Sequence, residues 1–142
     1  MQANMVELLF SGSAIIFRRK NMTVYELIKK VKEEKPNTFT DEKLVSYVNE
    51  IESEVAEQLG HTSAPVYSVD KIRTSSLLLG NPYDRLYVSY LKAMIDYANE
   101  EYASYENNQA QHVQDFRDFV DWVVRTGQME ERSFTSRFSN IY

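Results

Sequence analysis

Cysteine is absent from this sequence of 142 residues, which has only four glycines and three prolines. Without cysteine the chain can form no disulfide bond, supply no thiolate nucleophile and hold no cysteine-ligated metal. The scarcity of glycine and proline argues against a turn-rich β architecture. No apolar run approaches the roughly 20 residues that a membrane-spanning helix needs. A phosphate-cradling glycine loop and a G-x-S-x-G nucleophile turn are absent as well.

The composition is otherwise that of an ordinary globular protein, with 43% hydrophobic and 26% charged residues. This length suits one domain with one core. The net charge of −5 argues against a protein that coats nucleic acid. The two histidines, His61 and His112, lie in different predicted elements without the spacing of metal ligands, and we expect both to be exposed to solvent.

Three aspartates are the strongest candidates for chemistry. Asp115, Asp118 and Asp121 recur every three residues, a spacing that could indicate a metal site or a pair of catalytic carboxylates. Arg117 and Arg125 share their helix face, so a solvated face with salt bridges is the better interpretation. The sequence therefore predicts no catalytic residue, no metal and no cofactor, and we do not expect an enzyme.

Residues 1–21 differ from the rest of the chain. The run "MVELLFSGSAIIFRRK" resembles a weak signal peptide, but its charges follow the apolar part instead of preceding it. Arg-Arg-Lys-Asn-Met, residues 18–22, can be encoded by AGG AGG AAA AAT ATG, a bacterial ribosome-binding site followed by a start codon. We therefore expect the native chain to begin at Met22, with residues 1–21 a non-native extension. The alternative is a flexible arm that docks on a partner.

Two helices are predicted from their caps. Thr23, with Glu26 three residues later, forms a capping box, and Pro36 marks the end of the helix that follows. Thr40 is placed to cap a second helix, and Gly60 stands where a left-handed C-terminal cap belongs. Apolar residues follow helical spacing in both segments, namely Val24, Leu27, Ile28 and Val31, then Leu44, Val48, Ile51, Val55 and Leu59.

Two further helices should form a long hairpin. We expect the third to begin at Asn81-Pro82, with the proline at its first position, and to end near Glu106. Asn107-Asn108 is predicted as the turn, although one longer helix is possible. The fourth helix covers roughly 109–126 before Gly127, with Ala110, Val113, Phe116, Val120, Val123 and Val124 facing inward.

The segment 61–80 lacks helical periodicity and is predicted to be an irregular loop. A connection of this length inside a compact domain is uncommon, and it tends to be functional or ordered by a partner. The predicted fold class is therefore all-α, a small four-helix domain over residues 22–127 with a long helical hairpin. Residues 128–142 are expected to form an extended C-terminal docking tail.

Six of the ten tyrosines lie between Asn81 and Asn108. At about 100° per residue, the apolar and tyrosine side chains of the third helix span an arc of roughly 200°, twice what a one-sided helix buries. The second side should pack against the chain's own 61–80 loop or against a neighbouring subunit, and both can occur together. The predicted subunit-interface residues are Tyr83, Tyr87, Tyr90, Met94, Tyr97 and, from the fourth helix, Trp122.

The tail is locally basic on an acidic protein, because no acidic residue follows Glu131. Its apolar residues recur at i, i+4, i+7 and i+8, the pattern of one helix face. Eleven residues are too few for a stable isolated helix, so the segment should fold on docking to an apolar groove with an acidic rim. The alternative is a strand or turn folded back on the domain's own core. The predicted docking residues are Arg132, Phe134, Arg137, Phe138, Ile141 and Tyr142.

The pattern from Thr23 to Thr126 resembles the head–tail connector (adaptor, or head-completion) proteins of phages and prophages of low-GC Gram-positive bacteria. The resemblance rests on "ELIKKVKEEKPNTFTDEKLVSYVNEIESEV" and on "PYDRLYVSYLKAMIDYANEEYASYENNQAQHVQDFRDFVDWV". It includes no catalytic motif, so it implies a structural role and not a reaction.

This resemblance implies a viral structural protein of the virion neck, present in the host cytoplasm during assembly. Such adaptors form a homo-oligomeric ring on the portal protein, commonly of about twelve copies in closed cyclic symmetry. The ring extends the DNA channel, through which DNA passes only as transient cargo, and receives the stopper or tail-completion protein. The hairpin packs against neighbouring subunits and the tail binds the portal. The alternative is a cytosolic helical regulator that binds a single protein partner through the tyrosine-rich helix.

Overall fold

The structure is a computed structural model that describes residues 21–127. Within these residues the chain is all-α, as predicted, with four α-helices and no strand. The helices are α2 (Val24–Glu34), α3 (Asp41–Leu59), α4 (Arg85–Ala98) and α5 (Tyr102–Thr126), and a short 3-10 helix, η2 (Val69–Lys71), interrupts the connection between α3 and α4. Predictions about residues 1–20 and 128–142 lie outside the described residues.

The first two helices form where their caps predict them. Thr23 accepts a hydrogen bond from the backbone N–H of Glu26, whose side chain accepts one from the N–H of Thr23. Thr40 caps α3, and Gly60 ends it in the left-handed conformation with φ 84°. The buried residues include all nine that the apolar spacing predicts: Val24, Leu27, Ile28, Val31, Leu44, Val48, Ile51, Val55 and Leu59.

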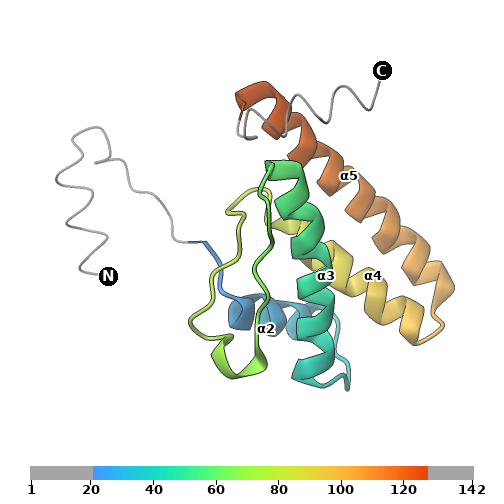
Figure 1. Ribbon diagram of the computed structural model, residues 1–142. Helices are drawn as coiled ribbons and strands as arrows, with labels where there is room; N and C mark the ends of the chain where they lie inside the picture. The colour runs from blue at the N-terminus through green and yellow to red at the C-terminus, as the bar shows by residue number, and fades with distance from the viewer. Residues whose placement is uncertain (1–20, 128–142) are drawn as a thin grey trace.

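Helix α4 lies at the centre of the domain. It pairs along its length with α5, while α3 and α2 pack on its other sides (Figure 1). Leu86, Leu91, Ala93 and Ile95 are fully buried around its circumference. The prediction that this helix is buried on two sides is therefore confirmed. Its second cover is the chain itself, since α3 and the 61–80 segment pack there.

The hairpin turns at residues 99–101, so the predicted turn at Asn107-Asn108 is wrong. Glu100 takes the left-handed conformation with φ 61°. The buried Asp96 carboxylate accepts hydrogen bonds from Ser104 and Asn108, both at 2.7 Å. Asn108 is thus a helical residue whose side-chain amide donates a hydrogen bond to Asp96. Since α4 begins at Arg85, the predicted start at Asn81-Pro82 is also too early, and residues 81–84 form a turn.

An ion pair fixes the hairpin turn to α2. The Lys35 ammonium lies 2.6 Å from the Asp96 carboxylate and 3.4 Å from that of Glu101. Burial opposes ionisation of Asp96, but the hydrogen bonds from Lys35, Ser104 and Asn108 outweigh it and lower the pKa of the carboxyl. The residue just after α2 therefore holds the far end of the α4–α5 hairpin.

The inward face of α5 differs from the predicted one. His112, Asp115, Phe119 and Val123 are buried. Val123 is correctly placed, and Phe116 and Val120 are half-buried, whereas Ala110, Val113 and Val124 are exposed and were placed wrongly. Polar His112 and Asp115 can face α4 because Ser89 and a backbone carbonyl of α4 bind them. For the same reason the predictions of an exposed His112 and a solvated Asp115 are wrong.

The 61–80 segment is ordered by the domain itself. Asn49 of α3 binds the backbone of Tyr67 in both directions, accepting from its N–H at 2.8 Å and donating to its carbonyl at 3.2 Å. The segment then runs back past the start of α2, where Thr23 and Ser76 form an isolated antiparallel bridge. Asn21 also contacts it, donating to the carbonyls of Leu77 and Leu78. Asn21, predicted to precede the native chain, therefore packs on the domain.

None of the helices within residues 21–127 is long and apolar enough to span a membrane.

Candidate functional site

Two tyrosine hydroxyls meet at one buried carboxylate. Glu52 of α3 is fully buried, and it accepts hydrogen bonds from the hydroxyls of Tyr67 and Tyr87, each at 2.5 Å, and from the backbone N–H of Leu78 at 2.9 Å. The Tyr87 hydroxyl also accepts from the N–H of Leu79 at 3.2 Å. This cluster ties α3, α4 and the 61–80 segment together, so it is part of the core.

The prediction that Tyr87 belongs to a subunit interface is therefore wrong. Its side chain is fully buried within its own domain. Burial raises the pKa of the Glu52 carboxyl, although the hydrogen bonds from the two hydroxyls and from Leu78 oppose the shift. Burial, together with the Glu52 carboxylate, also raises the pKa values of Tyr67 and Tyr87. Neither hydroxyl titrates near neutral pH, so both act as hydrogen-bond donors.

Three other predicted interface residues are half-buried and packed against the core: Tyr83, Tyr90 and Met94. Trp122, also half-buried, stacks on Tyr83 with the ring centroids 5.1 Å apart and an interplanar angle of 28°. The structure thus joins these two predicted residues to each other, at the end of the hairpin nearest Gly127. Both side chains are therefore only partly available to a partner.

Tyr90 connects three helices. Its hydroxyl donates to Glu50 of α3 at 2.9 Å, and its ring centroid lies 5.2 Å from that of His112 on α5. Burial and the hydrogen bond to Glu50 raise the pKa of Tyr90, and the negative charge of Glu54 adds to the shift. Glu50 and Glu54 therefore both lie near the Tyr90 hydroxyl.

Tyr97 is the predicted interface residue that is most exposed. It lies near the hairpin turn and is 57% exposed. Its ring centroid is 6.0 Å from that of Tyr102, which is 55% exposed, and 5.3 Å from that of Tyr105. Tyr97, Tyr102 and Tyr105 form an aromatic group that we call the tip cluster. Such rings combine a large apolar face with a hydroxyl that can remain hydrated.

An apolar stripe runs along α5. Its residues were predicted from the sequence to face inward, so its exposure was not expected. It consists of Val113, Phe116, Val120 and Val124, which are spaced by three and four residues and so share one side of the helix. Val113 is 44% exposed and Val124 is 49% exposed. We call these four residues the α5 stripe. The apolar arc of α5, which also includes Phe119 and Val123, is wider than one neighbouring helix can cover, and this width is the signal in the sequence.

Large exposed hydrophobic side chains concentrate on the hairpin. Within residues 21–127 there are five of them, and four belong to α4 or α5: Tyr97, Tyr102, Val113 and Val124. The fifth, Val66, lies in the 61–80 segment. Because contiguous exposed apolar surface marks contact sites, the tip cluster and the α5 stripe are the two candidate functional surfaces of the hairpin.

A serine, a histidine and an aspartate also come together, but without the geometry of a nucleophilic triad. The Ser89 hydroxyl donates to Asp115 at 3.0 Å, and His112 Nδ1 lies 3.1 Å from the carbonyl oxygen of Leu86. Since a carbonyl only accepts, Nδ1 carries the proton and cannot act as a base toward Ser89, 3.4 Å away. Burial lowers the pKa of His112, which keeps the ring neutral. This buried group joins α4 to α5.

A cavity of about 540 Å³ opens between α2, α4 and α5. Three of its charged side chains pair with one another, since Glu34 lies 2.8 Å from Lys92 and 3.6 Å from Lys30. Asp118, which is half-buried outside the cavity, lies 3.9 Å from Arg85 on the cavity wall. Asp115, also on the cavity wall, accepts hydrogen bonds from Ser89 and Gln111, so this carboxylate binds side chains of the domain itself. Within residues 21–127, no three histidine, aspartate or glutamate side chains converge as metal ligands do.

Comparisons of this chain with protein families, with curated proteins and with solved structures find no match.

Proposed function

We propose that this protein is a structural adaptor of the phage neck, which assembles as a ring on the portal and connects the head to the stopper or tail. The observation that carries the proposal is the tip cluster at the turn of the α4–α5 hairpin, where the Tyr97 and Tyr102 side chains are 57% and 55% exposed. An adaptor ring needs such a surface on every copy, because each subunit contacts two neighbours.

The domain supports this surface rigidly. The Glu52 cluster, the Lys35–Asp96 ion pair and the Ser89–Asp115 hydrogen bond each fasten the hairpin or α4 to another element. A surface held in this way can bind a neighbour without first being ordered, which reduces the entropic cost of association.

The tip cluster is the part of the hairpin best suited to subunit contact. Aromatic side chains are enriched in the buried centres of interfaces, and Tyr97 and Tyr102 are both more than half exposed. The proposed interface therefore shifts from the middle of α4, where Tyr87 is buried, toward the hairpin turn.

The net charge of −5 suits a ring around a DNA channel. A lining with negative charge repels the phosphate backbone, so DNA can slide through the channel without sticking to it. The proposed portal anchor is the C-terminal tail from Arg132 to Tyr142, which lies outside the described residues. The protein would have no catalytic role and no cofactor.

Co-sedimentation with portal rings tests the proposal. Tyr97→Ser combined with Tyr102→Ser removes the exposed rings without touching the core, and it should strongly reduce the number of copies that sediment with each portal. Val66→Ser is the matched control, because Val66 is 84% exposed but lies outside the hairpin. Equal recruitment of the two variants would contradict a hairpin interface. If the protein does not bind portals and remains a monomer or dimer, the result would instead favour a cytosolic regulator.

A further inference from the structure

The α5 stripe remains only partly covered by the rest of the described chain. Phe116 and Val120 are half-buried, and Val113 and Val124 are about half exposed. Isolated exposed valines are ordinary, but a continuous apolar stripe over three helical turns favours a bound partner. The tip cluster belongs to the other end of the hairpin, so the stripe is a separate surface.

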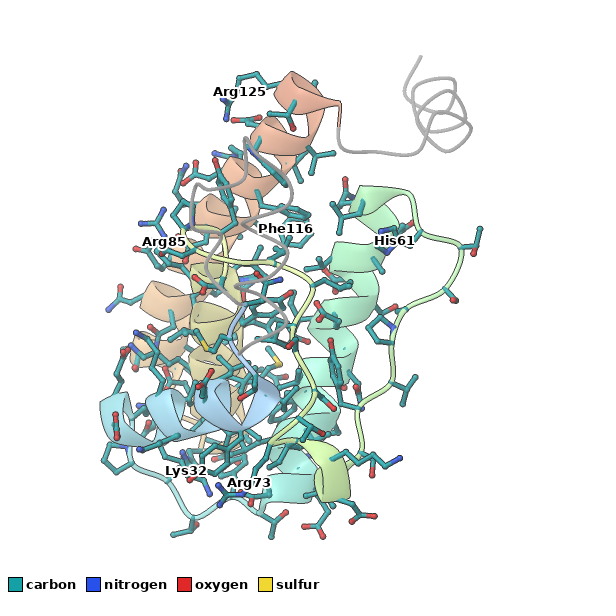
Figure 2. The ribbon with its side chains drawn as sticks, turned by 90° about the vertical axis from the view of Figure 1, so that its left-hand side faces the viewer. Lys32, His61, Arg73, Arg85, Phe116 and Arg125 are labelled. Carbon is teal, nitrogen blue, oxygen red and sulfur yellow. The ribbon has the colours of Figure 1, made fainter. Side chains whose placement is uncertain are left out.

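Carboxylates of α3 are linked to the stripe through a series of side-chain contacts. Phe116 lies on the side of α5 toward α3 (Figure 2), and its ring centroid is 5.8 Å from that of His112, which contacts Tyr90. Tyr90 in turn binds Glu50 of α3. Burial raises the pKa of the nearby Glu54, and neighbouring carboxylates add to this shift. No salt bridge within residues 21–127 engages Glu50 or Glu54.

We propose that the α5 stripe is the docking site for the C-terminal segment of the same chain, residues 132–142. This segment has the matching chemistry. Its apolar residues recur with helical spacing, which suits helix-on-helix packing, and it carries two arginines and no acidic residue. The arginines complement the carboxylates of α3, while the apolar side chains cover the valines. The residues that would make these contacts are Arg132, Phe134, Arg137, Phe138, Ile141 and Tyr142.

The connection to the stripe is short and begins in the right place. α5 ends at Thr126, and Gly127 takes the left-handed conformation with φ 66°, which directs the chain away from the helix axis. Phe134 follows Gly127 by seven residues, a reach of up to about 24 Å. The stripe from Val124 to Val113 is only about 16 Å long. The segment can therefore reach all of it.

Tethering favours the chain's own segment over a second copy. A short connection to the folded domain holds a segment at an effective concentration in the millimolar range, far above the micromolar concentration at which proteins are usually handled. A weak contact is then sufficient to occupy the stripe. The inference concerns the free chain and stands apart from the proposed function. If that function also holds, binding of the tail to the portal would uncover the stripe for a neighbouring subunit.

Paramagnetic NMR of the full chain tests this docking. The chain contains no cysteine, so Ser136→Cys introduces a single thiol in the segment for a spin label. We expect loss of the amide signals of Val113, Phe116, Val120 and Val124, and of α3 near Glu54. The signals of α2, which packs elsewhere, should remain.

Variants within the segment provide the controls, since they leave the folded domain unchanged. Phe138→Ser with Ile141→Ser should restore the signals of the stripe, whereas Ser139→Ala with Asn140→Ala should not. Intact stripe signals in the labelled chain would overturn the proposal. So would an equally strong effect between a spin-labelled chain and an unlabelled one, because the occupant would then be a second copy. Portal co-sedimentation is measured separately, so failure of the proposed function leaves this result unaffected.

Discussion

Tyr87→Phe is expected to destabilise the protein strongly although it removes a single oxygen atom. The ring is kept, so no cavity forms. The lost hydroxyl donates to Glu52 at 2.5 Å and accepts from the N–H of Leu79 at 3.2 Å, and all three residues are buried. A hydrogen bond to a charged group contributes about 1.5–3 kcal/mol and a neutral one about 0.5–1.5 kcal/mol. We therefore expect a loss of roughly 2–4.5 kcal/mol in the free energy of unfolding.

Tyr90→Phe is the matched control on the same helix. Its hydroxyl donates to Glu50, whose carboxylate is exposed and can bind water instead, so the loss should stay below about 1 kcal/mol. Urea unfolding followed by circular dichroism measures both variants. With a denaturant slope of about 1–3 kcal/mol per molar, the midpoint for Tyr87→Phe should fall by roughly 0.7 M or more. If the two variants differ by less than about 0.5 kcal/mol, the Glu52 cluster does not stabilise the fold.

Three further predictions concern the core, the hairpin turn and the pH dependence. Leu91→Ala should cost about 2–5 kcal/mol in thermal unfolding because it leaves a cavity, and Phe116→Ala, at a half-buried position, should cost clearly less; the reverse order would refute the orientation of α5. Asp96→Ala should accelerate amide hydrogen exchange at the hairpin turn while exchange in α3 stays slow, and uniform acceleration would contradict a local role. Burial lowers the pKa of His112 in the folded protein, so as the pH falls the unfolded chain is protonated at this residue before the folded one. The contribution of His112 to the free energy of unfolding should be fully present above pH ~6.5 and decrease below it by up to about 1.4 kcal/mol per pH unit. His112→Gln should remove this contribution, and urea titrations at several pH values would measure it.

The helices with strong caps could be predicted from the sequence alone. Thr23, Thr40 and Gly60 define the ends of α2 and α3 through contacts within a few residues, and such local chemistry is visible in the sequence. The hairpin turn was predicted in the wrong place because Asn107-Asn108 resembles a turn. In the structure Asn108 is a helical residue that donates a hydrogen bond to the buried carboxylate of Asp96. Asp96 lies twelve residues earlier in the sequence, so this role is not visible in the local pattern.

The candidate site was predicted only in part, because helical spacing gives the direction of a side chain and not its depth. Tyr97 and Tyr87 belong to the same set of predicted interface residues, yet Tyr97 is mostly exposed and Tyr87 is fully buried. The difference comes from Glu52, 35 residues before Tyr87 in the sequence. No local pattern indicates that a glutamate in an acidic helix will be buried.

Electron microscopy of the full-length protein mixed with its cognate portal tests the central claim most directly. The account predicts a ring of this protein seated on the portal and coaxial with its channel, with each hairpin in contact with the adjacent subunit. The account would be contradicted by portal particles that carry no ring of this protein when it is present in large molar excess and remains as free monomers or dimers.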